Sequence, residues 1–137
     1  MSTQLDDLIG KVITSVKTNT DNTFISFEFL DGTEVTYIAE GDCYSHSWIA
    51  HLNGLDYLIG QTVTSIIERD LHHLDAETPN GDETKVYGWT VTTSLGYFDL
   101  EMRNLSSGYY GGYLEKLTPK TRLYNPIPQL SHVLEDF

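Results

Sequence analysis

The chain has a single cysteine, Cys43, and no long run of apolar residues among its 137 residues. One cysteine excludes an internal disulfide, so we expect a reducing compartment, the cytoplasm. A membrane-spanning helix needs about 20 consecutive apolar residues, which this sequence lacks. The first residues also lack the basic and apolar regions of a signal peptide. We therefore expect no contact with a membrane.

Basic residues are also scarce, because eight Lys and Arg stand against twenty Asp and Glu, for a net charge of −12. This charge repels phosphate backbones and excludes ordinary binding to DNA or RNA. It has two interpretations. It can serve solubility alone, or it can suit a protein partner with a basic surface.

The residues that are abundant favour one domain, 1–137, built mostly of strands: aromatic residues make up 12% of the chain and include nine Tyr. The segment 5–16 recurs at 55–66 with seven identical residues. Each copy predicts a helical turn that ends at a glycine, Gly10 or Gly60, and continues into a β-branched strand. A hairpin follows each copy. The chain therefore divides into units 5–54 and 55–117 and a tail, 118–137.

The expected fold class is α+β, mostly β, with six antiparallel strands that form one sheet or a half-open barrel. The strands are predicted near 11–18, 23–30, 33–39, 61–69, 86–94 and 97–104, with a last short strand at 111–117. Trp48, Ile49 and Leu52 have helical spacing before Gly54, which predicts a short central helix within 44–54. Polar residues 70–84 predict an exposed, mobile loop. The proline-containing tail is expected to be extended, with a turn of helix at 129–134.

Alternation of apolar and polar residues predicts the register of both hairpins. A bulged loop, 30–32, pairs Phe27 with Val35 in the first hairpin. In the second, a loop at Leu95–Gly96 pairs Val91 with Leu100, Trp89 with Met102 and Gly88 with Arg103. The predicted core consists of Ile25, Phe27, Val35, Trp48, Ile66, Trp89, Val91 and Leu100.

A stretch rich in small residues and tyrosines is the first candidate for ligand binding: Arg103, Asn104, Ser106, Ser107, Gly108, Tyr109 and Tyr110. Backbone N–H groups of small residues can converge on an anion, and the guanidinium group of an Arg can donate two parallel hydrogen bonds to phosphate or carboxylate. Trp48 or a tyrosine would stack on a base. The alternative is a loop and edge strand, with Arg103 in a salt bridge to Glu101 or Asp99.

A second cluster precedes the predicted helix and contains Asp42, Cys43, Ser45 and His46. Cys43 could act as a nucleophile with His46 or His51 as its base. Alternatively, Asp42 and Ser45 cap the helix while Cys43 fills core. The adjacent His72 and His73 cannot point to one metal from a regular element, so we expect no metal and no cofactor.

These stretches resemble a family of small uncharacterised proteins from bacteriophages and some bacteria. The resemblance covers about residues 8–117. It rests on Gly10-Lys11-Val12-Ile13, on Asp42-Cys43-Tyr44 followed by Trp48-Ile49, on Leu58-Ile59-Gly60, and on Ser107-Gly108-Tyr109-Tyr110. The family has a second Cys where this chain has Tyr44, and the tail after Thr118 has no counterpart.

The resemblance implies a phage-type accessory protein acting against host defence in the host cytoplasm. We expect a non-catalytic binding protein that sequesters a small, anionic, nucleotide-like signal. The alternative is an acidic inhibitor that binds a host protein, for instance as a DNA mimic. A cysteine-dependent enzyme is the third hypothesis, and assembly into a homo-oligomer is left open.

Overall fold

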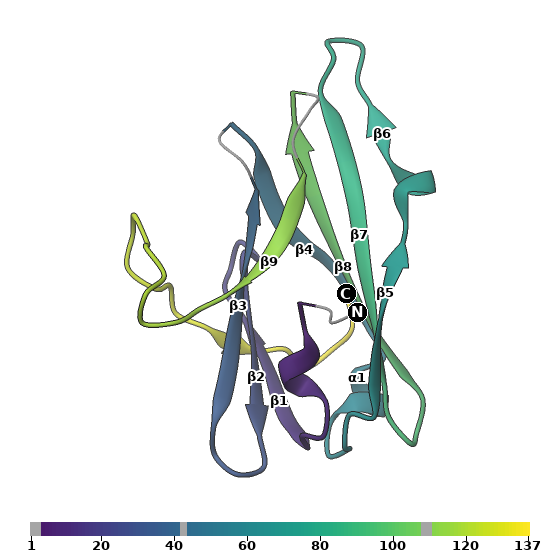
Figure 1. Ribbon diagram of the computed structural model, residues 1–137, viewed down its shortest axis with the longest axis vertical. Helices are drawn as coiled ribbons and strands as arrows, with labels where there is room; N and C mark the ends of the chain where they lie inside the picture. The colour runs from purple at the N-terminus through teal and green to yellow at the C-terminus, as the bar shows by residue number, and fades with distance from the viewer. Residues whose placement is uncertain (1–3, 42–43, 108–110) are drawn as a thin grey trace.

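The computed structural model describes residues 4–41, 44–107 and 111–137, and within these ranges ten strands form two antiparallel sheets that face each other (Figure 1). The first sheet has the order β10-β1-β2-β3-β9 and the second the order β4-β8-β7-β5. The mostly β prediction is thus confirmed. The predicted count of six strands is not exact, and the strands form two sheets, where one sheet or a half-open barrel was predicted.

The bounds of the strands of the first sheet are β1 (Ile13–Thr18), β2 (Phe24–Phe29), β3 (Glu34–Gly41), β9 (Gly112–Lys116) and β10 (Ser131–His132). The second sheet contains β4 (His46–Asn53), β5 (Ser65–Asp70), β7 (Glu83–Thr92) and β8 (Tyr97–Ser106), and β6 (Ala76–Glu77) pairs with β7. The helical elements are η1 (Asp6–Leu8), α1 (Leu55–Leu58) and η2 (His72–Leu74). No helix in the described ranges is long and apolar enough to cross a membrane.

The two copies of the sequence repeat meet each other through reciprocal hydrogen bonds. η1 and α1 are followed by Gly10 and Gly60, both at φ +83°, as the repeat predicts. The Gly10 N–H donates to the Val63 carbonyl (2.8 Å), and the Gly60 N–H donates to the Ile13 carbonyl (2.7 Å). Because residues 50 positions apart make the same bond, the contact has local twofold symmetry.

Each half of the chain also gives one strand to the other half. β4 follows β3 in the sequence but pairs with β8, and β9 follows β8 but pairs with β3. The meander β1-β2-β3 is thereby completed by a strand from the second half, and β5-β7-β8 by a strand from the first. The halves are interlocked, and the core lies between their sheets.

The first hairpin has the predicted register, and the second does not. Phe27 pairs with Val35, and Gly32 has φ +87°. In the second hairpin Val91 pairs with Phe98 and Trp89 with Leu100, two residues from the predicted partners. The Thr93 N–H donates to the Gly96 carbonyl, which places the turn at 94–95. A two-residue shift keeps every side chain on its face, so alternation could not distinguish the two registers.

The predicted helix within 44–54 is wrong, because this segment is β4 and pairs with β8 along its length. The register shifts between Ile49 and His51, which leaves Ala50 as an extra, bulged residue. The bulge turns Ile49 and Leu52 to the same face although they are three positions apart, and both are buried. The bulge therefore gives the buried residues of a strand the spacing that is typical of a helix.

Six of the eight predicted core residues are buried: Ile25, Phe27, Val35, Trp89, Val91 and Leu100. Ile66 is partly buried and packs against the core. Trp48 is the error, because it lies on the outer face of β4 and remains partly exposed.

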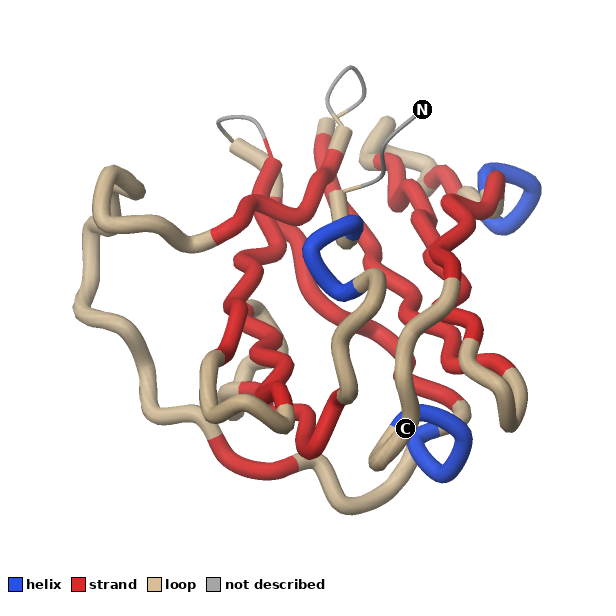
Figure 2. The backbone as a smooth tube through the Cα atoms, turned by 60° about the horizontal axis from the view of Figure 1, so that its bottom comes forward, coloured by secondary structure: helices blue, strands red, loops and turns tan. Residues whose placement is uncertain are grey.

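Residues 70–84 and the tail contain more structure than predicted. η2 and β6 lie within 70–84, and Leu71 is buried. In the tail, β10 pairs with β1, and the expected helical turn at 129–134 is absent from these described residues. Figure 2 shows the tail leaving the strands as an open loop at the left and returning along the lower edge.

Candidate binding surface on the second sheet

The predicted ligand residues of β8 point to opposite sides of the second sheet. Arg103 faces outward and remains partly exposed, whereas Asn104 and Ser106 are buried on the inner face. Successive residues of a strand alternate between faces, so these three side chains cannot line one site. Ser107 is exposed after the end of β8.

Strand pairing brings Arg103 beside Trp48, because the two residues are partners in the β4–β8 ladder. The His46 ring stacks on the Trp48 ring, with centroids 5.3 Å apart and an interplanar angle of 20°. Leu105, the partner of His46, is 38% exposed. We name these four outward side chains, His46, Trp48, Arg103 and Leu105, the β4–β8 patch.

An ion-pair network adjoins the β4–β8 patch. The Arg103 Nε–H donates to the Glu101 carboxylate at 3.1 Å, and His51 Nε2 lies 3.6 Å from the same carboxylate. The salt bridge foreseen as the alternative role of Arg103 is therefore present. The predicted opposition of Arg103 and Gly88 is wrong, because Arg103 pairs with Val86. The space over Gly88 is also filled, since a Cβ there would lie 2.5 Å from Leu71.

Asn104 of β8 lies where β8 approaches both β4 and β3. Its Nδ2 donates to Ser47 Oγ, and Ser47 Oγ donates to the Glu40 carbonyl, both at 2.8 Å. A Cβ on Gly41 would lie 2.5 Å from Asn104 Nδ2, and one on Gly112 would lie 2.9 Å from Asn104 Cβ. Asn104 thus ties β8 to β4 and β3 in a tightly packed interior, and we assign it a structural role.

Several predicted site residues lie outside the described residues: Asp42, Cys43, Gly108, Tyr109 and Tyr110. The chain on either side of them is paired, Gly41 with Gly112 and His46 with Leu105. The ends of both candidate stretches therefore meet at the same end of the molecule. The proposed chemistry of Cys43 stays a prediction. Of its candidate bases, His46 stacks on Trp48 and His51 lies next to Glu101.

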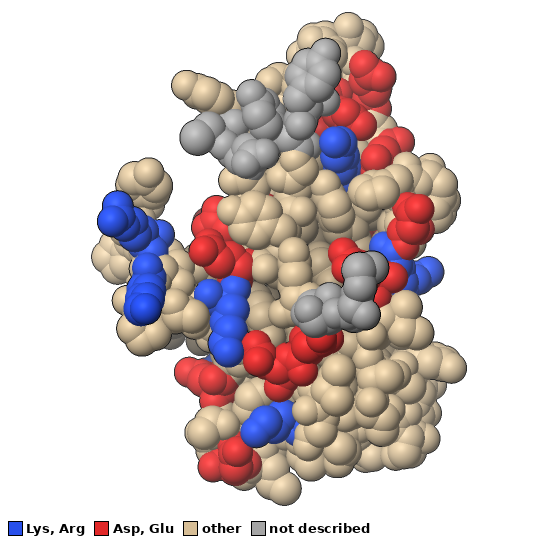
Figure 3. Space-filling model, in the orientation of Figure 1, with Lys and Arg blue, Asp and Glu red and all other residues tan. Residues whose placement is uncertain are grey.

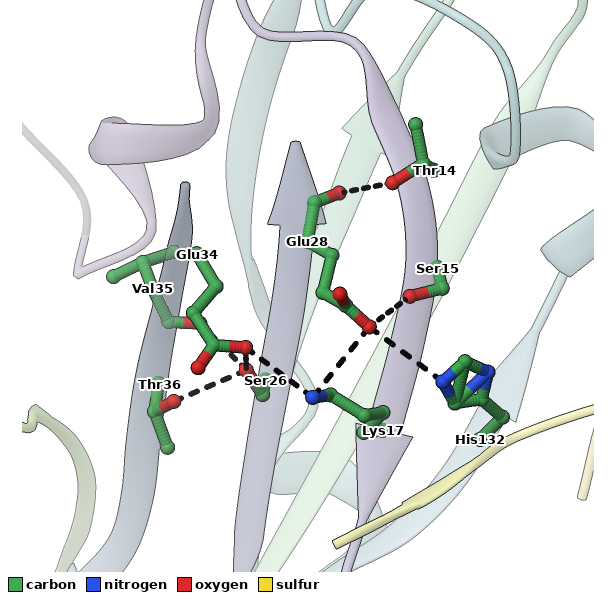
Figure 4. Close-up of polar contacts among 9 residues, drawn as sticks. All are labelled: Thr14, Ser15, Lys17, Ser26, Glu28, Glu34, Val35, Thr36 and His132. Atoms are coloured by element: carbon green, nitrogen blue, oxygen red, sulfur yellow. Dashed lines mark hydrogen bonds and ion pairs between the residues drawn. The ribbon is translucent and has the colours of Figure 1, made fainter. Parts of the chain in front are cut away.

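A polar cluster that the sequence did not indicate covers the outer face of the first sheet (Figure 4). Ser15 Oγ donates to the Glu28 carboxylate at 2.6 Å. Lys17 Nζ lies 3.5 Å from Glu28 and 3.3 Å from Glu34, and His132 of the tail lies 3.6 Å from Glu28. No local motif marks this cluster, because its members come from four strands.

The charge interactions in this cluster link neighbouring strands of the first sheet. The Ser15 hydroxyl holds the pKa of the Glu28 carboxyl below its ordinary value, and Lys17 and His132 act in the same direction. Burial lowers the pKa of Lys17, but the hydrogen bonds and negative charges of Glu34 and Glu28 have the larger combined effect and raise this pKa above its ordinary value. Because the carboxylates share one ammonium and are already bonded, we assign the cluster to stability.

A depression of about 420 Å³ adjoins the ion-pair network beside the β4–β8 patch, and it is lined by His51, Arg69, Asp99, Glu101 and the chain end at Phe137. Arg69 and Asp99 lie 3.8 Å apart across it. Within the described ranges, no group of three or more His, Cys, Asp and Glu side chains could hold a metal ion. The side chains of the β4–β8 patch face outward and are partly or fully exposed, which suits contact with another surface.

The fold and the patch define a small protein of two antiparallel sheets with an open surface on one of them. Residues 6–115 match the domain of unknown function DUF7448, so the chain belongs to that family. The chain is also similar to the uncharacterized protein L278 of Acanthamoeba polyphaga mimivirus, at 30% identity over 107 residues, covering 75% of this chain and 84% of that protein. No solved structure matches the chain.

These comparisons confirm the coarser part of the expected resemblance, an uncharacterised family with viral members. The matched range also ends close to the predicted limit, before the tail. The motif details quoted for the family stay a prediction.

Proposed function

We propose that this protein is a non-catalytic binding protein that attaches to a basic surface of another protein through the β4–β8 patch. The observation that carries the proposal is the pairing of Trp48 with Arg103 on an open strand face. Trp and Arg are the side chains that most often dominate protein interfaces. Small ligands prefer enclosed pockets that bury most of their surface, whereas an open face suits a protein.

Charge supports a basic partner. The net charge of −12 attracts such a partner over a distance and accelerates encounter, while Trp48 and Leu105 supply apolar contact. The similarity to a mimivirus protein supports a viral setting. In that setting the partner is a host protein that this acidic accessory protein blocks, in the manner of an inhibitor or a DNA mimic.

One observation favours a second candidate, the sequestering of a small nucleotide-like anion. In the described part of the chain Arg103 is bonded only through Nε to Glu101, so its two terminal nitrogens are available to an anion. Trp48 next to it offers an aromatic face. The second candidate would use the same two side chains with a different ligand.

The experiment compares wild-type protein with Trp48→Ser, Arg103→Ala and a control, Tyr97→Ser. Tyr97 is also an exposed aromatic residue of β8, but it lies at the opposite end of the strand. Each protein is immobilised and exposed to an extract of the cells in which it naturally occurs. We expect a protein retained by wild type and Tyr97→Ser and lost from the two patch variants, with release at high salt.

Calorimetric titration with a panel of mononucleotides and cyclic dinucleotides separates the two candidates. Binding that depends on Arg103 would support the small-ligand candidate in place of the protein partner. Retention of the same proteins by wild type and Trp48→Ser would show that the β4–β8 patch is not the binding surface.

A further inference from the structure

A second groove lies on the other sheet, between the outer face of β2 and β3 and the tail. We name residues 118–130 the tail arm. The groove has a volume of about 370 Å³. The sheet contributes Phe24, Ile38 and Ala39 to it, and the tail arm contributes Leu123, Pro126 and Pro128. The groove therefore has apolar walls on both sides.

The charged groups of this groove are the carboxylates of Asp21 and Glu40, and its neutral polar residues are Asn19, Thr23, Tyr124 and Asn125. In the described residues neither carboxylate accepts a hydrogen bond or forms an ion pair. Burial raises the pKa of the Glu40 carboxyl, and the nearby Glu115 carboxylate adds to this effect. A carboxylate beside apolar walls and a like charge lacks a compensating cation.

The tail arm itself does not supply that cation. Its two basic residues, Lys120 and Arg122, are exposed, and neither forms an ion pair within the described ranges. Figure 3 shows basic side chains gathered on the tail at the left, away from the acidic side chains of the sheets. The groove also offers too few ligands for a metal, since no cluster of three or more suitable side chains exists among the described residues.

We propose that this groove receives a Lys or Arg side chain from an extended basic segment of a partner protein. The aliphatic stem lies between Phe24 and the prolines of the tail arm, and the charged head reaches Glu40 and Asp21. Long basic side chains bury their methylene groups on apolar surface while the head stays near a counter-charge. The site is on the opposite sheet from the β4–β8 patch, so it goes beyond the proposed function.

The test uses hexalysine as the probe and measures its affinity for the full chain by calorimetry at low salt. Glu40→Gln is expected to weaken binding about tenfold, as loss of one partly buried charge pair would. The matched control is Glu68→Gln, which removes an exposed carboxylate of the second sheet. It should change the affinity by less than about twofold, because surface charges contribute little individually.

A second pair of variants tests the apolar wall without changing charge. Leu123→Ser removes part of the tail-arm wall and should weaken hexalysine binding several-fold. Leu134→Ser alters a tail residue that is 86% exposed and outside the groove, and should not. Equal weakening by Glu40→Gln and Glu68→Gln would overturn the proposal, because binding would then be general attraction to an acidic surface.

Two further readings complete the test. Thermal unfolding confirms that each variant remains folded. Tyr97→Ser alters an exposed residue outside both the groove and the β4–β8 patch and should bind hexalysine as wild type does. Retention of a protein from the cell extract by Glu40→Gln tests the β4–β8 patch separately, so failure of the groove and failure of the patch can be distinguished. Undiminished binding of hexalysine in which every side-chain amine is acetylated would also overturn the proposal, since the neutral probe keeps the stem and lacks the charge.

Discussion

The two tryptophans show how one extra residue decides the environment of a side chain. Trp48 and Trp89 both belong to the predicted core. The β4 bulge at Ala50 assigns the inner face to Ile49 and Leu52, so Trp48 faces outward. Trp89 lies on the inner face of β7 and is 1% exposed. A bulge reverses the alternation that follows it, and sequence alternation does not reveal where it occurs.

We therefore expect opposite results from the same substitution at the two tryptophans. Trp89→Ala should lower the free energy of unfolding by about 3–5 kcal/mol through lost contacts and the remaining cavity. Trp48→Ala should lower it by less than about 1 kcal/mol, because the site is open to solvent. Urea unfolding measures both. Equal losses would show that Trp48 is a core residue after all.

The bond from Ser15 to Glu28 predicts a dependence of stability on pH. Because the pKa of Glu28 is lowered in the folded protein, its contribution is complete above the unfolded value of 4.5 and is lost as pH falls through the folded value. Ser15→Ala removes the largest cause of that shift. The difference in unfolding free energy between wild type and Ser15→Ala should be present at pH 7 and shrink below about pH 4. A difference that stays constant down to pH 2 would contradict this assignment.

At the scale of elements, the tail joins the two sheets. β10 pairs with β1 of the first sheet, while Phe137 and Leu52 of the second sheet exchange backbone hydrogen bonds at 2.8 and 2.9 Å. Between these contacts, the Asp136 carboxylate accepts the N–H groups of Gly54 and Leu55, each at 3.0 Å. The start of α1 therefore receives its cap from a residue more than 80 positions away.

Removal of this cap should have a measurable cost. Asp136→Ala leaves the two N–H groups without their acceptor and should lower the unfolding free energy by about 1 kcal/mol, as loss of a helix cap does. Glu135→Ala is the matched control, because it removes the same charge from the adjacent, exposed position. Equal effects of the two substitutions in urea unfolding would assign the change to net charge.

At the scale of the whole molecule, the repeat and the strand exchange make the two halves dependent on each other. Besides the reciprocal glycine bonds, the Ile13 N–H donates to the Gln61 carbonyl and the Val63 N–H donates to the Lys11 carbonyl. β4 and β9 each complete the sheet of the other half. Neither half can open without exposing strand edges and core of the other.

Hydrogen exchange should reflect this dependence. We expect the amides of Gly10, Ile13, Gly60 and Val63 to exchange with one common free energy, equal to that of global unfolding. The control is the Lys120 amide, which donates to Thr118 Oγ1 at 3.2 Å in an exposed turn of the tail arm and should exchange far faster. Different exchange free energies for Gly10 and Gly60, measured by NMR, would show that the halves open separately.

The candidate surfaces were only partly predictable. Trp48 and Arg103 were both named from the sequence, but for different reasons, and only the β4–β8 ladder makes them neighbours. The groove under the tail arm was not predictable at all. Its walls come from residues 19–40 and 123–128, and no local pattern links segments so far apart.

Features that depend only on neighbouring residues can be predicted from the sequence. Gly10 and Gly60 end their helical turns because glycine tolerates positive φ, and the first hairpin has the register that its loop and alternation require. The strand conformation of 44–54, the register of the second hairpin and the docking of the tail depend on contacts between distant parts of the chain. In each case two local arrangements satisfied the same apolar pattern. The choice between them depended on which partner strand completed a sheet and buried that pattern.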